Sequence, residues 1–555
     1  MAGGLLNLTA IGNANVILTG NPTKTFFKVV YSKYTNFGLQ KFRIDFNGLR
    51  DLKLTESTTF QFKIPRYADL LMDTYLSVTL PDIWSPIYHP CQENAYTWAP
   101  YDFRWIKDLG SQMVKEVSIT CGSVLLHKYS GAYLSALVDR DYSPSKKAIF
   151  NEMTGNVKEI YDVANAYGHL NTYPSAFYTG DPNVTAEPSI RGRTLYIPIH
   201  AWFTSDSRCA FPLIALQYNE LSIHVTLRPI QELFQVRDVF DFGNQYPYMQ
   251  PDFNQTQFAM YRFLQSPPDE IIDANEYTNK TTTWNADVHL VSTYAFLSED
   301  ERRQFALEDQ VYLVKEVFEY HFPNVVGTKR VSLTSNGMIA SWMWFFQRND
   351  ANMRNEWSNY TNWPYRTIPN DIQRASTNSL TGKVPTGPGV QPTVEGQALG
   401  TNTGYFITGP FSQDNIRDIL VSMGILLNGS YRENVLPIGV YEYLEKFTKS
   451  EGLYTNKGLY CYNFCLNTSP FEYQPSGAIN LSKFKTVELD VTTIVPTVSS
   501  NNANFGVICD TDGNPIGVSK LNWRLYDYTY NMTLFEERYN VVSFISGNCG
   551  MLYAR

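Results

Sequence analysis

Residues 473–482 read YQPSGAINLS and carry the most informative local signal in this chain. Pro475 presets one backbone angle of a turn, and Gly477 permits a positive φ at little steric cost. Beyond the turn, residues 487–492 (VELDVT) alternate apolar and polar side chains, which is typical of a strand with one buried face. The segment therefore predicts a turn that leads into the edge of a β-hairpin.

Alternation of this kind extends through the rest of the chain. Residues 60–64 (FQFKI) and 221–227 (LSIHVTL) both set a row of apolar side chains against a more polar row. Turn residues separate such runs at short intervals, as in all-β sandwiches. Helix signals are few; Ser298 and Glu301 match a capping box and predict one short helix. The predicted fold class is all-β, with a few short helices.

Length, charge and aromatic content are consistent with large β sandwiches whose surfaces contact other protein. A length of 555 residues favours two to four domains, and two large sandwiches fit it. Charged residues make up 18%, below the roughly 25% of typical soluble domains. Aromatic residues reach 15%, with 38 Tyr and 33 Phe, and both favour strands and large contact surfaces. Much of the exterior is therefore expected to contact other protein.

Charge and cysteine usage narrow the function classes. The chain has 45 basic and 53 acidic residues, a net charge of −8, and no run of five or more Lys or Arg. Binding nucleic-acid phosphates requires a concentrated basic face, so direct nucleic-acid contact is not expected. The seven cysteines lack a disulfide-framework spacing, and no secretory signal or long apolar stretch is present. We therefore expect folding in a reducing compartment and no membrane-spanning helix.

The sequence predicts no catalytic, cofactor-binding or metal-binding residue. Its histidines never fall at metal-ligand spacing; they stand at positions 89, 127, 169, 200, 224, 289 and 321. Cys461 and Cys465 are the only close cysteine pair, but zinc needs about four ligands and no partner pair follows at zinc-finger spacing. On a strand these two thiols would lie roughly 13 Å apart, so two buried free thiols are expected.

Two segments near the C-terminus are predicted to form structural turns and not a metal-binding or catalytic site. Residues 510–514 (DTDGN) resemble the start of a calcium-binding loop. Their glycine comes too early for such a loop, and Leu521 stands at the position of the bidentate glutamate. A hairpin turn is expected there instead. Residues 546–550 (SGNCG) lack the Gly-x-Ser-x-Gly order of a nucleophile elbow. Carboxylates from distant strands could still pair for glycoside hydrolysis, but no specific catalytic signal is present.

An ordered series of motifs resembles the major capsid proteins of nucleocytoplasmic large DNA viruses. Residues 473–482 resemble a C-terminal signature of that family, and residues 211–218 (FPLIALQY) its mid-chain block. Residues 21–31, followed by 34–37, resemble its opening strand. Further blocks follow in family order at residues 105–110, 117–122, 196–203, 297–305, 427–429, 539–541, 546–547 and 550–553. One block alone is weak evidence, but the series runs from about residue 20 to the end.

The resemblance implies two consecutive antiparallel jelly-roll sandwiches with long inserted surface loops. The expected division is an N-terminal arm at 1–20, a first jelly roll at 21–235, a connection at 236–285 and a second jelly roll at 286–555. Polar stretches at about 139–193 and 364–402 break the strand rhythm. The family carries such loops between the fourth and fifth strands of each jelly roll, where they form the outer tower of the capsomer.

The implied function is structural, without enzymatic activity or cofactors. A major capsid protein of this family forms homotrimers, and these pseudo-hexagonal capsomers tile the icosahedral shell of a large DNA virus. The implied partners are neighbouring capsomers, minor capsid and penton proteins and, through the N-terminal arm, an internal viral membrane. The implied location is the virion capsid, assembled in the host cytoplasm. An alternative from another class is a carbohydrate-binding or glycan-cleaving β-sandwich protein, because lectins share this architecture.

Overall fold

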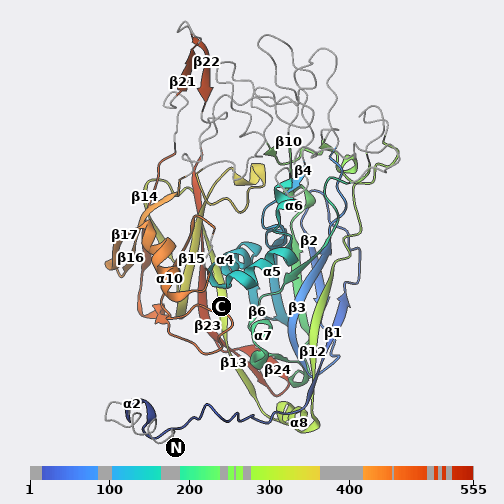
Figure 1. Cartoon of the computed structure of the whole chain (residues 1–555), viewed down its shortest axis with the longest axis vertical. Helices are drawn as coiled ribbons and strands as arrows, with labels where there is room; N and C mark the ends of the chain where they lie inside the picture. Colours follow the sequence, from blue (N-terminus) through green and yellow to red (C-terminus); the bar gives the residue numbers. More distant parts are fainter. Residues whose placement is uncertain are drawn as a thin grey trace, which may run out of the picture.

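A computed structural model shows two β sandwiches standing side by side (Figure 1). In Figure 1 the first sandwich, in blue and green, is on the right, and the second, mainly in orange and red, is on the left. The described residues are 16–85, 103–163, 188–237, 248–254, 258–266, 277–362, 417–452, 456–496, 505–509, 515–520 and 528–553. The predicted loop at 364–402 lies outside them.

The first sandwich packs two antiparallel sheets against each other. One sheet has the order β1 (Phe37–Asp45), β12 (His289–Leu297), β3 (Leu70–Thr79) and β7 (Thr194–Pro198), with β8 (Phe211–Pro212) beside β3. The facing sheet has the order β2 (Thr58–Lys63), β9 (Leu221–Leu227), β5 (Val114–Cys121) and β6 (Val124–Tyr129). A small third sheet joins β11 (Tyr248–Met249), β10 (Phe234–Arg237) and β4 (Phe103–Trp105).

The second sandwich repeats this plan. Its inner sheet has the order β13 (Gln310–Phe322), β23 (Tyr530–Ile545), β15 (Met338–Arg348) and β18 (Leu459–Asn463), with β24 (Asn548–Met551) on β23 and β19 (Ile479–Asn480) on β15. Its outer sheet has the order β14 (Thr328–Leu333), β20 (Val487–Thr493), β16 (Leu420–Leu427) and β17 (Ser430–Pro437). A separate hairpin pairs β21 (Phe505–Cys509) with β22 (Pro515–Lys520), as expected around residues 510–514.

The helices are short. They are α2 (Val16–Thr19), α3 (Leu109–Met113), α4 (Gly131–Asp141), α5 (Pro144–Thr154), α6 (Lys158–Tyr161), α7 (Trp202–Ser205), α8 (Glu299–Leu307) and α10 (Glu445–Lys449). Of these, α2 and α8 lie outside the sheets at the lower end of the molecule. One π-helical turn, η10 (Val440–Leu444), precedes α10, and 3₁₀ turns occupy 207–209, 213–215, 230–232, 260–262, 351–354 and 481–483. The all-β prediction with a few short helices is confirmed.

Strands with one buried face follow the alternation read from the sequence. In β2, Phe60 and Phe62 are buried while Gln61 and Lys63 are exposed. Strand β20 alternates buried and half-buried residues along its whole length. Each buried apolar side chain contributes roughly 1.5–3 kcal/mol relative to an exposed one, and this difference sets which row turns inward.

Strand β15, in the inner sheet of the second sandwich, is buried on both faces. In β15, Trp342 and Trp344 belong to the core between the two sheets of the second sandwich. Their neighbours Met343 and Phe345 belong to the core that continues into the first sandwich. A strand covered on both faces reads as a continuous apolar run, which explains why residues 339–346 show no polar row. The second sandwich is therefore packed onto the first over a shared hydrophobic core.

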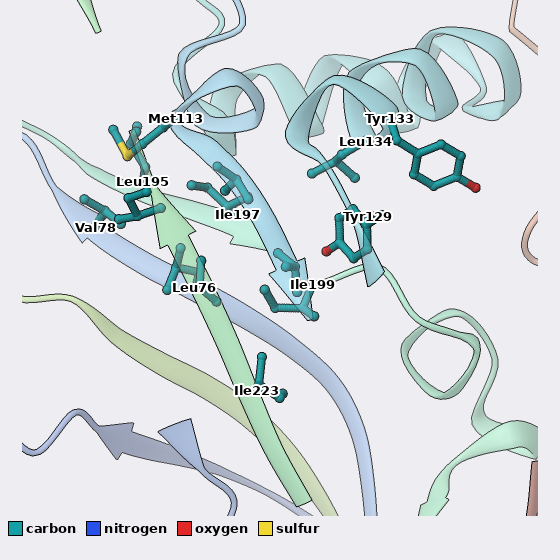
Figure 2. Packing of buried hydrophobic residues seen from close by; sticks show 14 of the residues in the cluster. Leu76, Val78, Met113, Tyr129, Tyr133, Leu134, Leu195, Ile197, Ile199 and Ile223 are labelled. Carbon is teal, nitrogen blue, oxygen red and sulfur yellow. The ribbon is translucent and has the colours of Figure 1, made fainter. Parts of the chain in front are cut away.

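Helix α4 provides the first sandwich's side of that shared core. Figure 2 shows Leu134 of α4 directed toward Ile197 and Ile199, whereas Tyr133 on the same helix turns away from them. Both side chains are buried. Helix α4 therefore packs on the first sandwich through Leu134 and contacts the second sandwich through Tyr133.

The predicted opening strand at residues 21–31 is wrong. The structure places no strand in this segment; β1 begins only at Phe37. Its apolar side chains have no core to enter: Phe26, Phe27 and Tyr31 are all exposed. In Figure 1 the segment runs along the lower end of the molecule to α2, away from both sandwiches.

Strand β12 shifts the expected division between the sandwiches. Its residues pair with β1, from Asp45 opposite His289 to Phe37 opposite Leu297, and with β3 on its other side. Since β12 completes the first sheet, a boundary at residue 286 separates it from the sandwich it belongs to. We propose that the division instead falls at α8, which links β12 to β13 at the lower end of Figure 1.

Part of the predicted loop at 139–193 is helical. Helix α5 begins with Pro144 in its first turn and ends at Gly155, which adopts a left-handed φ of 73° as its C-cap. A proline at the start and a glycine at the end are ordinary signals of a helix. The polar composition of the segment led instead to the prediction of a loop. Residues 164–187 of this stretch lie outside the described residues.

The segment at 473–482 bends at Gln474, but it joins no hairpin. Gly477 adopts a positive φ of 134°, which glycine permits at little steric cost. The following residues pair with β15 of the inner sheet as β19, whereas β20 lies in the outer sheet between β14 and β16. The segment therefore crosses from one sheet to the other, and β20 is a central strand. The prediction of a hairpin edge is wrong because local turn chemistry does not specify the next strand's partner.

The helix predicted at Ser298 is present. Helix α8 begins directly after Ser298, but the serine side chain makes no hydrogen bond to the helix's first amides. Its hydroxyl instead lies 3.5 Å from the Glu301 carboxylate, which also accepts a 2.6 Å hydrogen bond from Thr35. The helix therefore begins without a reciprocal capping box. The acidic residues of its first turn interact favourably with the positive end of the helix dipole.

Candidate assembly site at the junction of the two sandwiches

A buried ionic network forms the centre of the junction. Arg140 of α4 is fully buried and donates to both oxygens of Asp141, at 2.9 and 2.7 Å. The same guanidinium reaches the second sandwich, donating to Glu537 of β23 at 2.9 Å and to the Ser341 hydroxyl of β15 at 3.0 Å. The Tyr133 hydroxyl also donates to Glu537, at 2.9 Å. One helix of the first sandwich is thus bonded to two strands of the second.

The charges in this network compensate one another. Burial alone would raise the pKa of Glu537, but Arg140 lowers it to about 2, so the carboxylate is ionised. Burial would likewise lower the pKa of Arg140, and the facing carboxylates of Asp141 and Glu537 raise it above its ordinary value. A buried charge without a partner costs several kcal/mol, so these groups hold the two sandwiches in one relative position.

Two glycines permit the close approach at this centre. A Cβ at Gly131, the first residue of α4, would lie 1.9 Å from the Ser111 carbonyl oxygen. A Cβ at Gly452 would lie 2.3 Å from the Asp139 carbonyl oxygen. Gly452 also donates its backbone N–H to the Arg140 carbonyl at 2.9 Å. Helix α4 is therefore wedged between backbone segments of both halves of the chain.

A second contact lies at the upper end of the junction. Asn355 donates to the carbonyls of Gln231 and Phe234 at 2.7 and 2.8 Å. The Trp357 indole donates to the Glu232 carbonyl at 3.0 Å, and the Arg228 guanidinium stacks 4.0 Å above the same indole. Because side chains satisfy backbone groups of the first sandwich here, this contact also specifies one orientation.

A third contact lies at the lower end. The Gly547 carbonyl, in the β23–β24 turn, accepts backbone hydrogen bonds from Gln217 at 3.0 Å and Tyr218 at 3.3 Å. Cys121 of β5 and Cys549 of β24 are both free thiols buried in the same hydrophobic core. With contacts at both ends and in the middle, the sandwiches form one rigid unit.

The candidate residues discussed from sequence fall into structural positions. His127 and His200 come together, with ring centroids 6.3 Å apart, and burial lowers the pKa of His200 to about 4. His200 is therefore neutral at pH 7 and packs as a ring against Tyr129 and Tyr133. His224 is half-buried and lies 3.3 Å from the Thr120 hydroxyl. His89 and His169 lie outside the described residues.

The cysteine pair and the turn at residues 546–547 also have structural roles. Cys461 and Cys465 are buried free thiols, as expected. Ser546 and Gly547 both adopt positive φ in the tight β23–β24 turn. Across the part of the chain that the structure describes, no three His, Cys, Asp or Glu side chains gather as metal ligands. Nor does a helix within those residues have the length and apolarity to cross a bilayer.

Sequence reasoning named neither residue of the central ion pair. Arg140 and Glu537 stand 397 positions apart, and no local pattern links them. One signal was available: Glu536, Glu537 and Arg538 are charged residues within the otherwise uncharged strand β23. Charges inside such a strand are rarely buried unless they are paired, so they mark a contact whose partner only the fold reveals.

Twin jelly-roll sandwiches, bonded into one unit through a shared inner sheet, define a double jelly-roll protein. Among solved structures, the Faustovirus major capsid protein aligns with a TM-score of 0.56 at 12% identity, over 98% of each chain. A chain of the PBCV-1 virus capsid aligns with a TM-score of 0.57 at 18% identity, over 96% of this chain and all of that one. These likenesses confirm the predicted fold.

Sequence comparisons extend the assignment from fold to family. The profile described as "Major capsid protein N-terminus" matches residues 25–264, and "Large eukaryotic DNA virus major capsid protein" matches residues 301–550. The major capsid proteins of Phaeocystis pouchetii virus and Paramecium bursaria Chlorella virus 1 are 25% and 24% identical, with both chains covered completely in each alignment. The chain belongs to the major capsid proteins of large eukaryotic DNA viruses. The carbohydrate-binding alternative is not what these relatives support.

Proposed function

We propose that this chain forms a homotrimer with a pseudo-hexagonal outline, and that such capsomers tile an icosahedral viral shell. The observation that carries the proposal is the three-point junction between the sandwiches. Three chains contribute six similar sandwiches around one axis, but a sixfold outline needs the two sandwiches of each chain at a constant angle. The buried Arg140–Glu537 pair and the contacts at each end supply that constraint.

The lateral edge of the second sandwich supports a contact with the next copy. Exposed apolar side chains gather on β17, η10 and α10, a set we name the lateral patch; its members are Tyr431, Val435, Tyr443, Leu444 and Phe447. In Figure 1 this patch lies on the opposite side of the molecule from β1, an edge strand of the first sandwich. A head-to-tail contact between these two edges closes into a ring after three copies.

Gel filtration and negative-stain imaging test the proposal directly. Three chains of 63.4 kDa should elute together near about 190 kDa, and the particles should have hexagonal outlines. The reason is geometric, since six sandwiches of similar width occupy six sectors. A stable monomer with a round outline would contradict the proposed function.

The other partners follow from the shell role. We propose neighbouring capsomers and minor capsid and penton proteins as contacts, within a virion shell assembled in the host cytoplasm. The role is mechanical, so no catalytic step is proposed. The net charge of −8 supports a shell that does not bind the genome directly.

The N-terminal arm supports a contact beneath the shell. Residues 16–36 leave the lower end of the molecule, and their apolar side chains are exposed; Phe27 is 99% and Leu18 is 88% exposed. Such a segment is costly to leave in water and is readily covered by another surface. We propose that the arm contacts minor capsid proteins and the internal viral membrane at the inner base of the capsomer.

Deleting residues 2–18 should impair shell assembly and leave trimers intact. The deletion removes apolar residues of α2, including Ile17 and Leu18, without touching either sandwich. Trimer formation is measured by gel filtration, and shell assembly by particle yield in infected or co-expressing cells. A substitution of Leu307, exposed on α8, by serine is the matched control and should assemble normally. Normal particle yield from the truncated chain would contradict the arm's role.

A further inference from the structure

Two cysteines from opposite halves of the chain meet at the lower contact of the junction. Cys121 is the last residue of β5 in the first sandwich, and Cys549 lies in β24 of the second. Their side chains are neighbours in the same hydrophobic core. Both are reduced and buried, with exposed fractions of 0% and 5%.

The surrounding backbone holds these two strands together independently of the thiols. Gly547, two residues before Cys549, accepts the backbone hydrogen bonds of Gln217 and Tyr218. Gly122, next to Cys121, donates to the Glu220 carbonyl at 2.9 Å. Both thiols are thereby tied to the same segment, residues 217–220. Disulfide formation needs two cysteines whose sulfurs can approach from contact to about 2.05 Å without large backbone movement.

We propose that Cys121 and Cys549 form a redox clasp, an intrachain disulfide that locks the two sandwiches together when the protein meets a peroxide oxidant. The pair spans 428 positions of the chain and bridges both sandwiches, so the bond closes a loop that contains most of each. The clasp does not depend on the oligomeric state.

The chemistry balances with hydrogen peroxide as the oxidant. The Cys121 thiolate attacks one peroxide oxygen; an S–O bond forms, the O–O bond breaks and hydroxide leaves, taking up a proton to become water. The Cys549 sulfur then attacks the Cys121 sulfenic acid; the S–S bond forms, the S–O bond breaks, and the leaving hydroxide takes the Cys549 proton as a second water. The two thiols lose two electrons, and one peroxide is reduced to two waters.

The electrostatics of the pair support this order of events. The neighbouring Cys549 thiol lowers the pKa of Cys121, and the Arg66 charge acts in the same direction. The same interaction raises the pKa of Cys549, which stays a thiol. Since the thiolate is the nucleophile, Cys121 is the site of first oxidation.

The clasp is tested on the full-length chain, reduced and then exposed to a small excess of hydrogen peroxide. After denaturation in an alkylating reagent, the intact mass should show two of the seven cysteines protected, and a peptide map should show residues 121 and 549 cross-linked. Reductant should restore both alkylation sites. The oxidised chain should also unfold at a temperature higher by about 2 °C or more, because the bond restricts the unfolded chain.

Matched serine variants separate the clasp from general oxidation. Cys121→Ser and Cys549→Ser should each abolish the cross-link, whereas Cys461→Ser, at another buried free thiol, should leave it unchanged. The wild-type measurement needs no variant, so a poorly folded mutant does not decide the result. If both thiols remain alkylatable after oxidation, or if Cys121 proceeds only to sulfinic acid, the clasp is overturned.

Discussion

Replacing Arg140 by methionine should lower the free energy of unfolding by about 3–5 kcal/mol. The substitution keeps the length and apolar stem of the side chain but removes the charge that compensates Asp141 and Glu537. Both carboxylates are buried and would stay behind without a cationic partner. The Ser341 hydroxyl would lose its hydrogen bond from the guanidinium as well. The effect is measured as the shift of the urea midpoint of the full-length chain.

Two comparisons make the Arg140 result specific. Lys63→Ala removes an exposed ion pair with Glu220 and should leave the midpoint nearly unchanged, because water screens such pairs. Replacing Arg140, Asp141 and Glu537 together by apolar residues of similar size should recover much of the lost stability, because no buried charge then remains. An unchanged midpoint in Arg140→Met would show that the junction does not depend on this network.

Replacing Phe447 by aspartate should dissociate the trimer while leaving the subunit folded. Phe447 on α10 is 85% exposed in the single chain, so its loss removes little intramolecular packing. Within the proposed head-to-tail contact, the change removes an aromatic anchor and places a carboxylate in an apolar interface. Central anchors of this kind contribute about 2 kcal/mol or more, which weakens association by roughly 30-fold.

Sedimentation or gel filtration across a dilution series measures that loss. A matched control is Leu307→Asp, a similarly exposed apolar position on α8 at the lower end of the molecule, outside the lateral patch. The control should remain trimeric at the same concentrations. A Phe447→Asp chain that stays trimeric throughout the series would contradict the proposed contact at the lateral patch. It would not contradict the trimer itself.

The strands whose burial is one-sided could be predicted from the sequence. Residues 60–64 and 221–227 carry period-two patterns that became β2 and β9. The ordered motifs also pointed to the family and to its doubled sandwich. Errors arose where a local pattern was ambiguous: the apolar residues at 21–31 have strand-like composition, but no neighbouring strand is available to pair with them.

The amino-acid sequence on its own determined the fold class, because alternating short-range patterns recur along the chain, and its ordered motifs pointed to the family, whose resemblance implied two sandwiches. Only the tertiary structure decided that β12 completes the first sandwich, that β15 is buried on both faces, and that Arg140 meets Glu537. Those features are pairings between positions hundreds of residues apart, and their energy comes from desolvation inside a shared core. A local pattern can show that a strand or a charge needs a partner, but the packed chain selects which one.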